Sequence, residues 1–144
     1  MGNNQNDNIR IANNRIIANG GSNLAGAIGI FAGAENYEIA SNDLCGNFSA
    51  EYGGAISHFG LSPNGNIHHN RIYFNGSYDE GAGIMVAGEQ PATPTSLSPG
   101  SGPVNIYNNN SVVYYRLSEE ESERGGAWRG PQALAKPLPL QVFF

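Results

Sequence analysis

Three segments of the chain align without gaps, each 28 residues after the one before: Ile11-Ala-Asn-Asn-Arg-Ile-Ile-Ala-Asn19, Ile39-Ala-Ser-Asn-Asp-Leu-Cys-Gly-Asn47 and Ile67-His-His-Asn-Arg-Ile-Tyr-Phe-Asn75. Each has an aliphatic residue at its first and sixth positions and asparagine at its fourth and ninth. A glycine-containing block at 26–30, 54–58 and 82–86 keeps the same spacing. A fixed spacing between about 20 and 50 residues is typical of solenoids and repeat arrays.

Each repeat contains short β-prone pieces, which in the first repeat lie around residues 9–11, 16–17 and 28–31. Glycine, asparagine and serine separate these pieces, and none is long enough for an amphipathic helix. Three short strands joined by turns make one rung of a coil, and successive rungs pair as parallel strands about 4.8 Å apart. We therefore predict an all-β solenoid of about four rungs of 28 residues, in which equivalent residues stack in columns.

An asparagine column supports this register. Asn14, Asn42 and Asn70 fall at the bend between two predicted strands. Asparagine tolerates a left-handed conformation there, and its amide can bond the equivalent residue one rung away. The sequence therefore predicts an asparagine ladder along the coil.

Charged columns support the same register. Arg15, Asp43 and Arg71 form one column, and Arg10 and Glu38 form another. Stacking places opposite charges side by side, which contributes a few tenths of a kcal/mol per pair.

The repeat is interrupted after Glu89 by a Pro-, Ser- and Gly-rich insertion loop at residues 90–103. The motif resumes at Val104, and its Asn109 lies 39 residues after Asn70 instead of 28. Beyond residue 115 asparagine disappears, and the only Trp and the only Lys of the chain occur there. We predict repeats over 1–115 and an irregular tail or uncertain cap over 116–144, with a segment produced by a reading-frame change as an alternative.

Composition excludes several classes of partner. The 144-residue chain has a net charge of −5 and 13% charged residues, so no basic stripe is present to displace counterions from nucleic acid. No apolar run approaches the roughly 18 residues of a membrane helix. Residues 1–7 lack the basic and apolar regions of a signal peptide. The single Cys45 excludes an internal disulfide and a cysteine-rich metal site.

Two patterns over about residues 8–115, Asn-x-Ile-x-x-Asn-x-Ile and Gly-Gly-x-Ile, resemble the repeat of the pectate-lyase-like superfamily. The resemblance implies a right-handed parallel β-helix. That fold hosts lyases, hydrolases, epimerases, adhesins and noncatalytic surface proteins, so it specifies architecture far better than activity. Members with activity usually act on, or hold, acidic or neutral polysaccharides. The repeats here contain no lysine, and they lack the paired Asp-Asp and the Gly-His-Gly elements of pectin hydrolases.

One acidic turn carries the leading candidates for catalysis. Glu51 precedes a glycine pair, and Asp79 and Glu80 precede Gly-Ala-Gly, so the three residues enter the same turn of adjacent rungs. Carboxylates within roughly 5 to 10 Å of one another can cleave a glycoside as acid and base or nucleophile, or hold Ca²⁺. A solvated turn is the structural alternative. Tyr52 and Tyr78 lie beside this turn and are candidate substrate-binding rings, because one face of an aromatic ring is apolar.

His58 is a further catalytic candidate. Its column contains Ile30 and Val86, which favours an inward-facing core histidine with a local hydrogen bond. If the strand turns outward instead, His58 joins Glu51 and Asp79 along one groove.

Two other sets of polar residues have mainly structural interpretations. His68 and His69 are expected to be surface turn residues, because an adjacent histidine pair without a third ligand is weak evidence for a metal. Arg15 and Arg71 flank Asp43, and mutual neutralisation accounts for all three. We predict no metal and no cofactor, with Ca²⁺ at the acidic turn as the alternative.

These observations predict a carbohydrate-associated β-helix segment of a secreted or cell-surface protein that binds polysaccharide along one sheet. A polysaccharide lyase or glycoside hydrolase that uses the acidic turn is the second hypothesis, and a structural or adhesin stalk is the third. Strand-like residues begin at Ile9, and solenoid ends need caps. We therefore also expect part of a longer β-helix, or a module that stacks end to end on another chain.

Overall fold

The computed structural model describes residues 6–112, and this part of the chain is all β without a helix. The described residues contain no helix that is long and apolar enough to span a membrane. The first repeat contains β1 (Arg10–Ala12), β2 (Arg15–Ile17), β3 (Gly20–Gly21) and β4 (Ile28–Phe31). The second contains β5 (Glu38–Ala40), β6 (Asp43–Cys45), β7 (Phe48–Ser49) and β8 (Ile56–Phe59). The third contains β9 (Gly65–His68), β10 (Arg71–Tyr73), β11 (Gly76–Ser77) and β12 (Ile84–Ala87), and β13 (Val104–Tyr107) and β14 (Asn110–Val112) follow.

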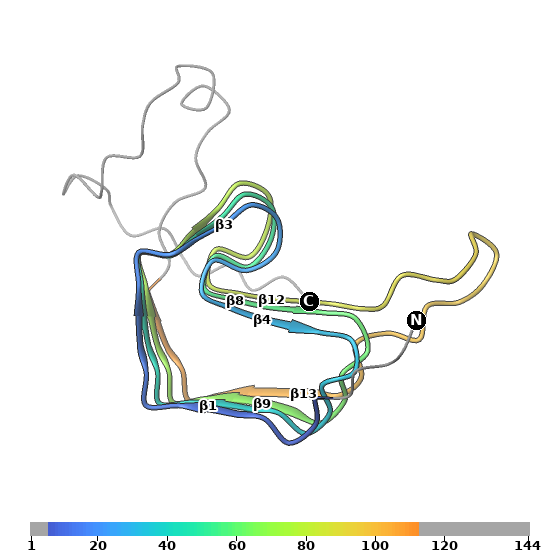
Figure 1. Ribbon diagram of the computed structural model, residues 1–144, viewed down its shortest axis with the longest axis horizontal. Coiled ribbons are helices and arrows are strands. Elements are labelled where there is room, and N and C mark those ends of the chain that lie inside the picture. The colour runs from blue at the N-terminus through green and yellow to red at the C-terminus, as the bar shows by residue number, and fades with distance from the viewer. Residues whose placement is uncertain (1–5, 113–144) are drawn as a thin grey trace, which may run out of the picture.

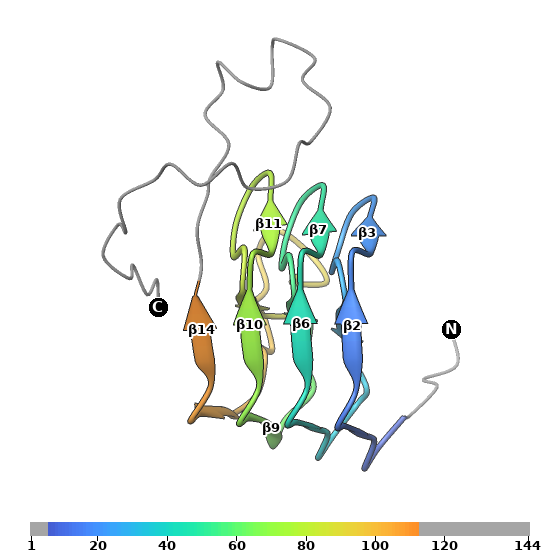
Figure 2. The same cartoon turned by 90° about the vertical axis from the view of Figure 1, so that its left-hand side faces the viewer.

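Each repeat contributes one strand to each of four sheets. The β1 sheet has the order β1-β5-β9-β13, the β2 sheet β2-β6-β10-β14, the β3 sheet β3-β7-β11 and the β4 sheet β4-β8-β12. All strand pairs within these sheets are parallel. In Figure 1 the repeats lie one behind another, the β1, β2 and β4 sheets surround an interior, and the β3 sheet lies in a lobe beside it. Figure 2 shows the strands of the β2 sheet side by side.

The pairing confirms the predicted register of 28 residues. Arg10 pairs with Glu38, and Asp43 lies between Arg15 and Arg71. The predicted number of strands per repeat was wrong, since each complete repeat has four and not three. The additional strands of the β3 sheet are two residues long and consist of Gly-Gly, Phe-Ser and Gly-Ser. Their backbones pair because the neighbouring repeats are already in register, and not because their side chains favour strands.

Aliphatic columns fill the interior. Ile39 and Ile67 of the β1 sheet, Leu44 and Ile72 of the β2 sheet and Ile56 of the β4 sheet are fully buried and belong to one hydrophobic cluster. Along β6, β9 and β10 these residues alternate with more exposed neighbours, as expected of a half-buried strand. Burial of each such side chain contributes about 1.5 to 3 kcal/mol.

The predicted asparagine ladder is present at the corner between the β1 and β2 sheets. The Oδ1 atom of Asn42 accepts the backbone N–H of Asn14 and its Nδ2–H, both at 3.0 Å. Asn70 Oδ1 accepts the same two groups of Asn42, at 2.9 and 3.0 Å, and Asn109 Oδ1 accepts those of Asn70. Asn42 Nδ2 also donates to the carbonyl of Ile11 at 2.8 Å. Each amide therefore binds the repeat before it and the repeat after it.

A second ladder lies at the corner between the β2 and β3 sheets. Asn47 Oδ1 accepts the backbone and side-chain N–H groups of Asn19, and Asn75 Oδ1 accepts those of Asn47. Asn47 and Asn75 are almost completely buried. Buried polar groups are tolerated only with partners, and the ladder provides a partner for every amide inside it.

The prediction of a left-handed conformation for the ladder asparagines was wrong. The positive φ angle falls on the residue before each of them, with values of 59° for Asn13, 56° for Ser41, 55° for His69 and 53° for Asn108. This residue makes the sharp bend at the corner. The bend turns the next side chain, which is the ladder asparagine, into the interior.

The insertion lies between β12 and β13. Glu89 and Gly100 form an antiparallel bridge at its base. Pairing then resumes with a spacing of 39 residues, because Ile67 pairs with Ile106. The predicted tail at 116–144 lies outside the described residues.

One core position combines a large residue with a small one. Tyr37 is fully buried, and its ring occupies the space above Gly65, which follows it in the same column. A Cβ atom built on Gly65 would lie 2.2 Å from Cζ of Tyr37. Real Cβ atoms do not approach this closely, so glycine is the residue that lets Tyr37 remain inside.

We expect Asn42→Ala to destabilise the protein by about 2 to 4 kcal/mol, because it leaves the Asn14 amide and the Ile11 carbonyl without their partners. Urea unfolding followed by circular dichroism measures this change. Asn23 is exposed and forms no side-chain hydrogen bond to the described residues, so Asn23→Ala is the matched control and should change stability by less than about 0.5 kcal/mol. Equal effects of the two substitutions would contradict the role assigned to the ladder.

We expect Gly65→Ala to cost about 1 to 3 kcal/mol, because the new methyl group displaces the Tyr37 ring. The cost should shrink in a Tyr37→Val background, where the ring is absent and the neighbouring column residues are Ile9 and Val104. A double-mutant cycle by urea unfolding measures the coupling. Additive effects would show that the two residues do not compete for space.

Candidate functional site

The predicted acidic turn is formed by adjacent repeats, as the register requires. Tyr52 pairs with Glu80 through a parallel bridge. The carbonyl oxygen of Glu51 accepts the N–H groups of Asp79 and Glu80, at 3.1 and 3.2 Å, and the hydroxyl of Ser77. Backbone contacts therefore hold Glu51 next to the other two acidic residues.

The carboxylates themselves make no such contacts. Glu51 is half-buried while Asp79 and Glu80 are exposed, and none of the three side chains forms a hydrogen bond or ion pair with another described residue. Within residues 6–112 no group of three or more His, Cys, Asp or Glu side chains is arranged to hold a metal ion. The turn thus brings the three residues together through the backbone without building a carboxylate cage of the kind that binds Ca²⁺.

The two tyrosines beside this turn differ in exposure. Tyr52 is half-buried, whereas Tyr78 is 47% exposed. The Tyr78 ring contacts Phe48 edge to face, with 5.4 Å between the ring centroids. An aromatic pair of this geometry holds the ring in place at the surface of the lobe.

His58 lies in the core, on the inner face of the β4 sheet. It is fully buried, its Nε2 atom is 2.8 Å from the Gly60 carbonyl and its Nδ1 atom is 2.8 Å from the Tyr37 hydroxyl. A carbonyl only accepts, so Nε2 carries the proton and Nδ1 accepts the Tyr37 O–H. Burial lowers the pKa of His58 and raises that of Tyr37. Both groups are therefore neutral, and His58 does not share a surface with the acidic turn.

The outer face of the β2 sheet carries a charged row, Arg15, Asp43 and Arg71, with two aromatic residues beside it, Tyr73 and Phe74; we call these five residues the arginine face. The side chains of Arg15 and Arg71 are 74% and 66% exposed. Each guanidinium group lies 3.9 Å from Oδ2 of Asp43, which is the limit for an ion pair and too long for a hydrogen bond. The three charges are thus adjacent but only loosely paired.

Asp43 keeps unused hydrogen-bonding capacity. Its Oδ1 atom is shielded from water and has no hydrogen-bond partner within residues 6–112. The Tyr73 side chain lies beside this carboxylate, and its interaction with Asp43 raises the pKa of Tyr73. A buried acceptor without a partner costs about 1 to 3 kcal/mol, so the fold tolerates this oxygen at some cost in stability.

Aromatic and aliphatic side chains border these charges. The guanidinium carbon of Arg71 lies 5.4 Å from the centre of the Tyr73 ring, and Tyr73 contacts Phe74 at 5.7 Å between centroids. Phe74 and Ile17 are 43% and 39% exposed. The arginine face therefore combines N–H donors, a carboxylate acceptor and exposed apolar surface on one sheet.

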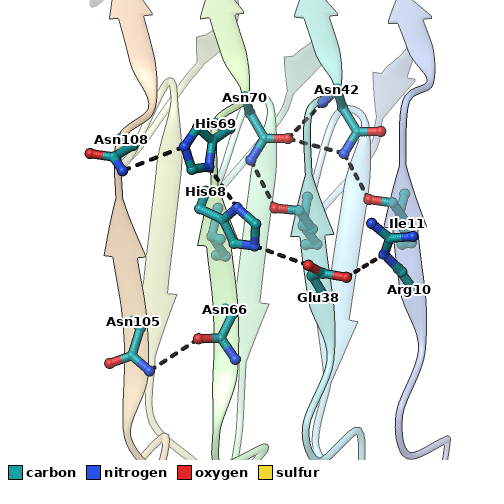
Figure 3. A network of polar contacts seen from close by, with 12 residues as sticks. Arg10, Ile11, Glu38, Asn42, Asn66, His68, His69, Asn70, Asn105 and Asn108 are labelled. Carbon is teal, nitrogen blue, oxygen red and sulfur yellow. Dashed lines mark hydrogen bonds and ion pairs between the residues drawn. The ribbon is translucent and has the colours of Figure 1, made fainter.

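The outer face of the β1 sheet holds a continuous polar network, shown in Figure 3. Arg10 donates to Oε2 of Glu38, and this contact lowers the pKa of Glu38. His68 Nε2 is 3.1 Å from Oε1 of Glu38, and the Nδ1 atoms of His68 and His69 are 2.8 Å apart. We call the five residues Arg10, Glu38, His68, His69 and Asn108 the histidine network.

Sequence reasoning missed both of these arrangements as candidate sites. It assigned Arg15, Asp43 and Arg71 to mutual neutralisation and did not join Tyr73 or Phe74 to them. The signal that could have joined them is the column formed by Ile17, Cys45 and Tyr73. Each of these residues lies two positions after a member of the charged column, so its side chain faces the same side of the sheet. For His68 the missed signal was Glu38, which occupies the outward column two residues earlier in the neighbouring repeat.

Since burial lowers the pKa of His58, acid should destabilise the protein through this residue. The unfolded chain binds the proton with a pKa of about 6.5. Stability is therefore retained above that value and falls as the pH drops from it toward the lower folded-state pKa, with a slope of at most about 1.4 kcal/mol per pH unit. His58→Gln removes this slope. Urea unfolding of the unaltered protein and of His58→Gln between pH 5 and 8 isolates the contribution of His58, because the other histidines are present in both proteins. If the two curves of unfolding free energy against pH are parallel, His58 makes no such contribution.

Comparisons of the chain with models of protein families, with curated protein sequences and with solved structures gave no match.

Proposed function

We propose that the chain is a segment of right-handed parallel β-helix that binds polysaccharide along the arginine face of the β2 sheet. An extracellular or cell-surface location is part of the proposal, as is the likeness to pectate-lyase-like proteins, which rests on the repeat alone. The single observation that carries the binding function is the row Arg15–Asp43–Arg71, in which two exposed guanidinium groups are only loosely paired with one carboxylate.

The views of the chain support the right-handed sense. In Figure 1 the chain runs clockwise, from β1 through the β2 sheet and back along β4. Figure 2, seen from the left-hand side of Figure 1, has the first repeat on the right, so the chain recedes from the viewer of Figure 1 as it turns. A clockwise path that recedes is right-handed, and parallel strands are connected with this hand in nearly all proteins.

The chemistry of the arginine face suits a sugar chain. Hydroxyl groups of a sugar can donate to Asp43 and accept from the guanidinium groups, while the apolar face of the ring packs on Phe74. The neighbouring strands lie about 4.8 Å apart, so equivalent groups repeat along the stack. A polymer with repeated hydroxyl or carboxylate groups can therefore bind several repeats at once.

Charge favours an acidic polysaccharide over a neutral one. The whole chain has a net charge of −5, but the arginine face carries two exposed arginines against one aspartate. Uronic acid carboxylates can each pair with an arginine in two parallel hydrogen bonds. We therefore propose uronic acid polymers as the preferred ligands.

Continued stacking of further coils at the ends is also part of the proposal. Ile106 belongs to the same core column as Ile39 and Ile67, which are fully buried, yet it is 48% exposed. An exposed core position is what stacking against another repeat covers.

The binding function can be tested with a panel of neutral and uronic acid polysaccharides by affinity electrophoresis and calorimetry. We expect binding to a uronic acid polymer that weakens with added salt. Arg71→Gln should reduce affinity roughly tenfold, which corresponds to about 1.4 kcal/mol. Arg10→Gln removes the same charge from the β1 sheet and is the matched control, with affinity unchanged.

Equal losses in Arg71→Gln and Arg10→Gln would show that net charge acts and not the arginine face. Binding to no polysaccharide would favour the stalk hypothesis. Cleavage of a polysaccharide that disappears in a Glu51→Ala, Asp79→Ala double variant would favour the lyase or hydrolase hypothesis instead.

A further inference from the structure

We propose that His68 and His69 form a binding site for a divalent transition metal ion, with Cu²⁺ as the preferred ion. Their Nδ1 atoms are 2.8 Å apart on the outer surface of the β1 sheet. This site is separate from the arginine face, and the proposal does not depend on polysaccharide binding.

The corner of the third repeat brings the two rings together. His68 is the last residue of β9 and faces outward, because it is two residues from the outward-facing Asn66 and next to the buried Ile67. His69 has a φ angle of 55°, so the chain bends at this residue, and its side chain stays on the same side as that of His68. The rings lie nearly perpendicular, at 88°, with centroids 5.1 Å apart. Consecutive residues of a regular strand would point to opposite faces.

A carboxylate fixes the tautomer that a metal needs. Glu38 accepts a hydrogen bond from Nε2 of His68, so that nitrogen carries the proton and Nδ1 presents its lone pair. Arg10 binds the other oxygen of Glu38 and keeps the carboxylate in place. A metal-bound histidine whose second nitrogen donates to a carboxylate is a recurrent arrangement that raises the basicity of the ligand.

The position of the His68 ring is held from a second side. Tyr107 stacks on it with a centroid distance of 4.9 Å and an interplanar angle of 14°, and the His68 side chain is only 17% exposed. His69 is exposed, so an ion can reach the pair from solvent. One ligand is thus preorganised while the other remains accessible.

The spacing of the two nitrogens indicates which ion fits. With metal–nitrogen bonds of about 2.0 to 2.1 Å, nitrogens 2.8 Å apart subtend roughly 85° at the metal. That angle suits the tetragonal geometry of Cu²⁺ or Ni²⁺ better than the tetrahedron of Zn²⁺, and Cu²⁺ binds nitrogen ligands most tightly. Rotation of the exposed His69 ring about χ2, which is a soft torsion, turns its Nδ1 lone pair toward an ion bound at Nδ1 of His68, while the His68 ring keeps its contacts with Glu38 and Tyr107. Because the described residues supply no group of three such ligands, water completes the coordination.

Binding requires one proton to move. In the hydrogen-bonded pair His69 donates from Nδ1 to His68 and accepts from Asn108 at Nε2, where the Nδ2–Nε2 distance is 3.5 Å. In the metal-bound pair the proton of His69 resides on Nε2 instead, and the Asn108 amide turns to accept it through Oδ1. No proton is gained or lost overall.

The test uses the full chain without an affinity tag, freed of metal by dialysis against a chelator and titrated with CuSO₄ and then NiCl₂. Electron paramagnetic resonance of the first equivalent of Cu²⁺ should show two nitrogen ligands, and calorimetry gives the affinity. His68→Ala and His69→Asn should each weaken binding tenfold or more. These residues stand at the same positions of other repeats, as Ala12 and Asn13, so both variants should fold. Circular dichroism checks that they do.

Glu38→Gln is a positioning variant and should weaken binding by about tenfold with both nitrogen ligands still present in the spectrum. His58→Gln removes a buried histidine and should leave copper affinity unchanged. The proposal is overturned if copper does not bind. It is also overturned if His68→Ala and His69→Asn bind the first equivalent of Cu²⁺ as tightly as the unaltered protein. That second result would assign the copper to another group, such as the N-terminal amine.

Discussion

The carboxamide oxygen of each inner ladder asparagine accepts two N–H groups from the repeat before it, and the amide nitrogen reaches back to a carbonyl of that repeat. Asn42 makes this set of contacts with Asn14 and Ile11, and Asn70 repeats it with Asn42 and Ile39. A shift of one residue in the pairing would break every contact at once and would move the aliphatic columns from the interior to the surface. The register therefore depends on these amides more than on any single apolar contact.

Fixed register has consequences for the rest of the core. Because each side chain meets the equivalent side chain of the next repeat, an inward column of aliphatic residues can hold a tyrosine ring only where the neighbour is small. Tyr37 above Gly65 satisfies this condition, and the Tyr37 hydroxyl then reaches His58. The buried histidine is thus a result of packing, which explains why a residue that often serves in catalysis is neutral and inaccessible here.

Much of this architecture could be predicted from the sequence, because the same pattern of aliphatic and asparagine residues occurs in several repeats and fixes which residues are equivalent. The parallel pairing, the asparagine ladder and the inward position of His58 follow from column membership alone. The strands of the β3 sheet could not be predicted, since Gly20 and Gly21 have no side chains that favour a strand and pair only because the register is set elsewhere. The left-handed residue was assigned one position too late, because Ser41 and His69 carry no common signal of a positive φ angle. Distances such as the 3.9 Å between Arg71 and Asp43 depend on side-chain packing, which a column does not specify.

The candidate sites occur where a column changes its residue type. The outward column that begins with Ala12 and Ala40 becomes His68 and then Tyr107, and only there do two imidazoles, a stacked ring and a carboxylate meet. The column of Ile17 and Cys45 becomes Tyr73, beside the charged row of the arginine face. The inward columns cannot vary in this way without cost, because each buried residue must match its neighbours in volume and hydrogen bonding. Outward positions are free of that constraint. In a solenoid, binding sites can therefore form at outer-face residues that depart from the repeat.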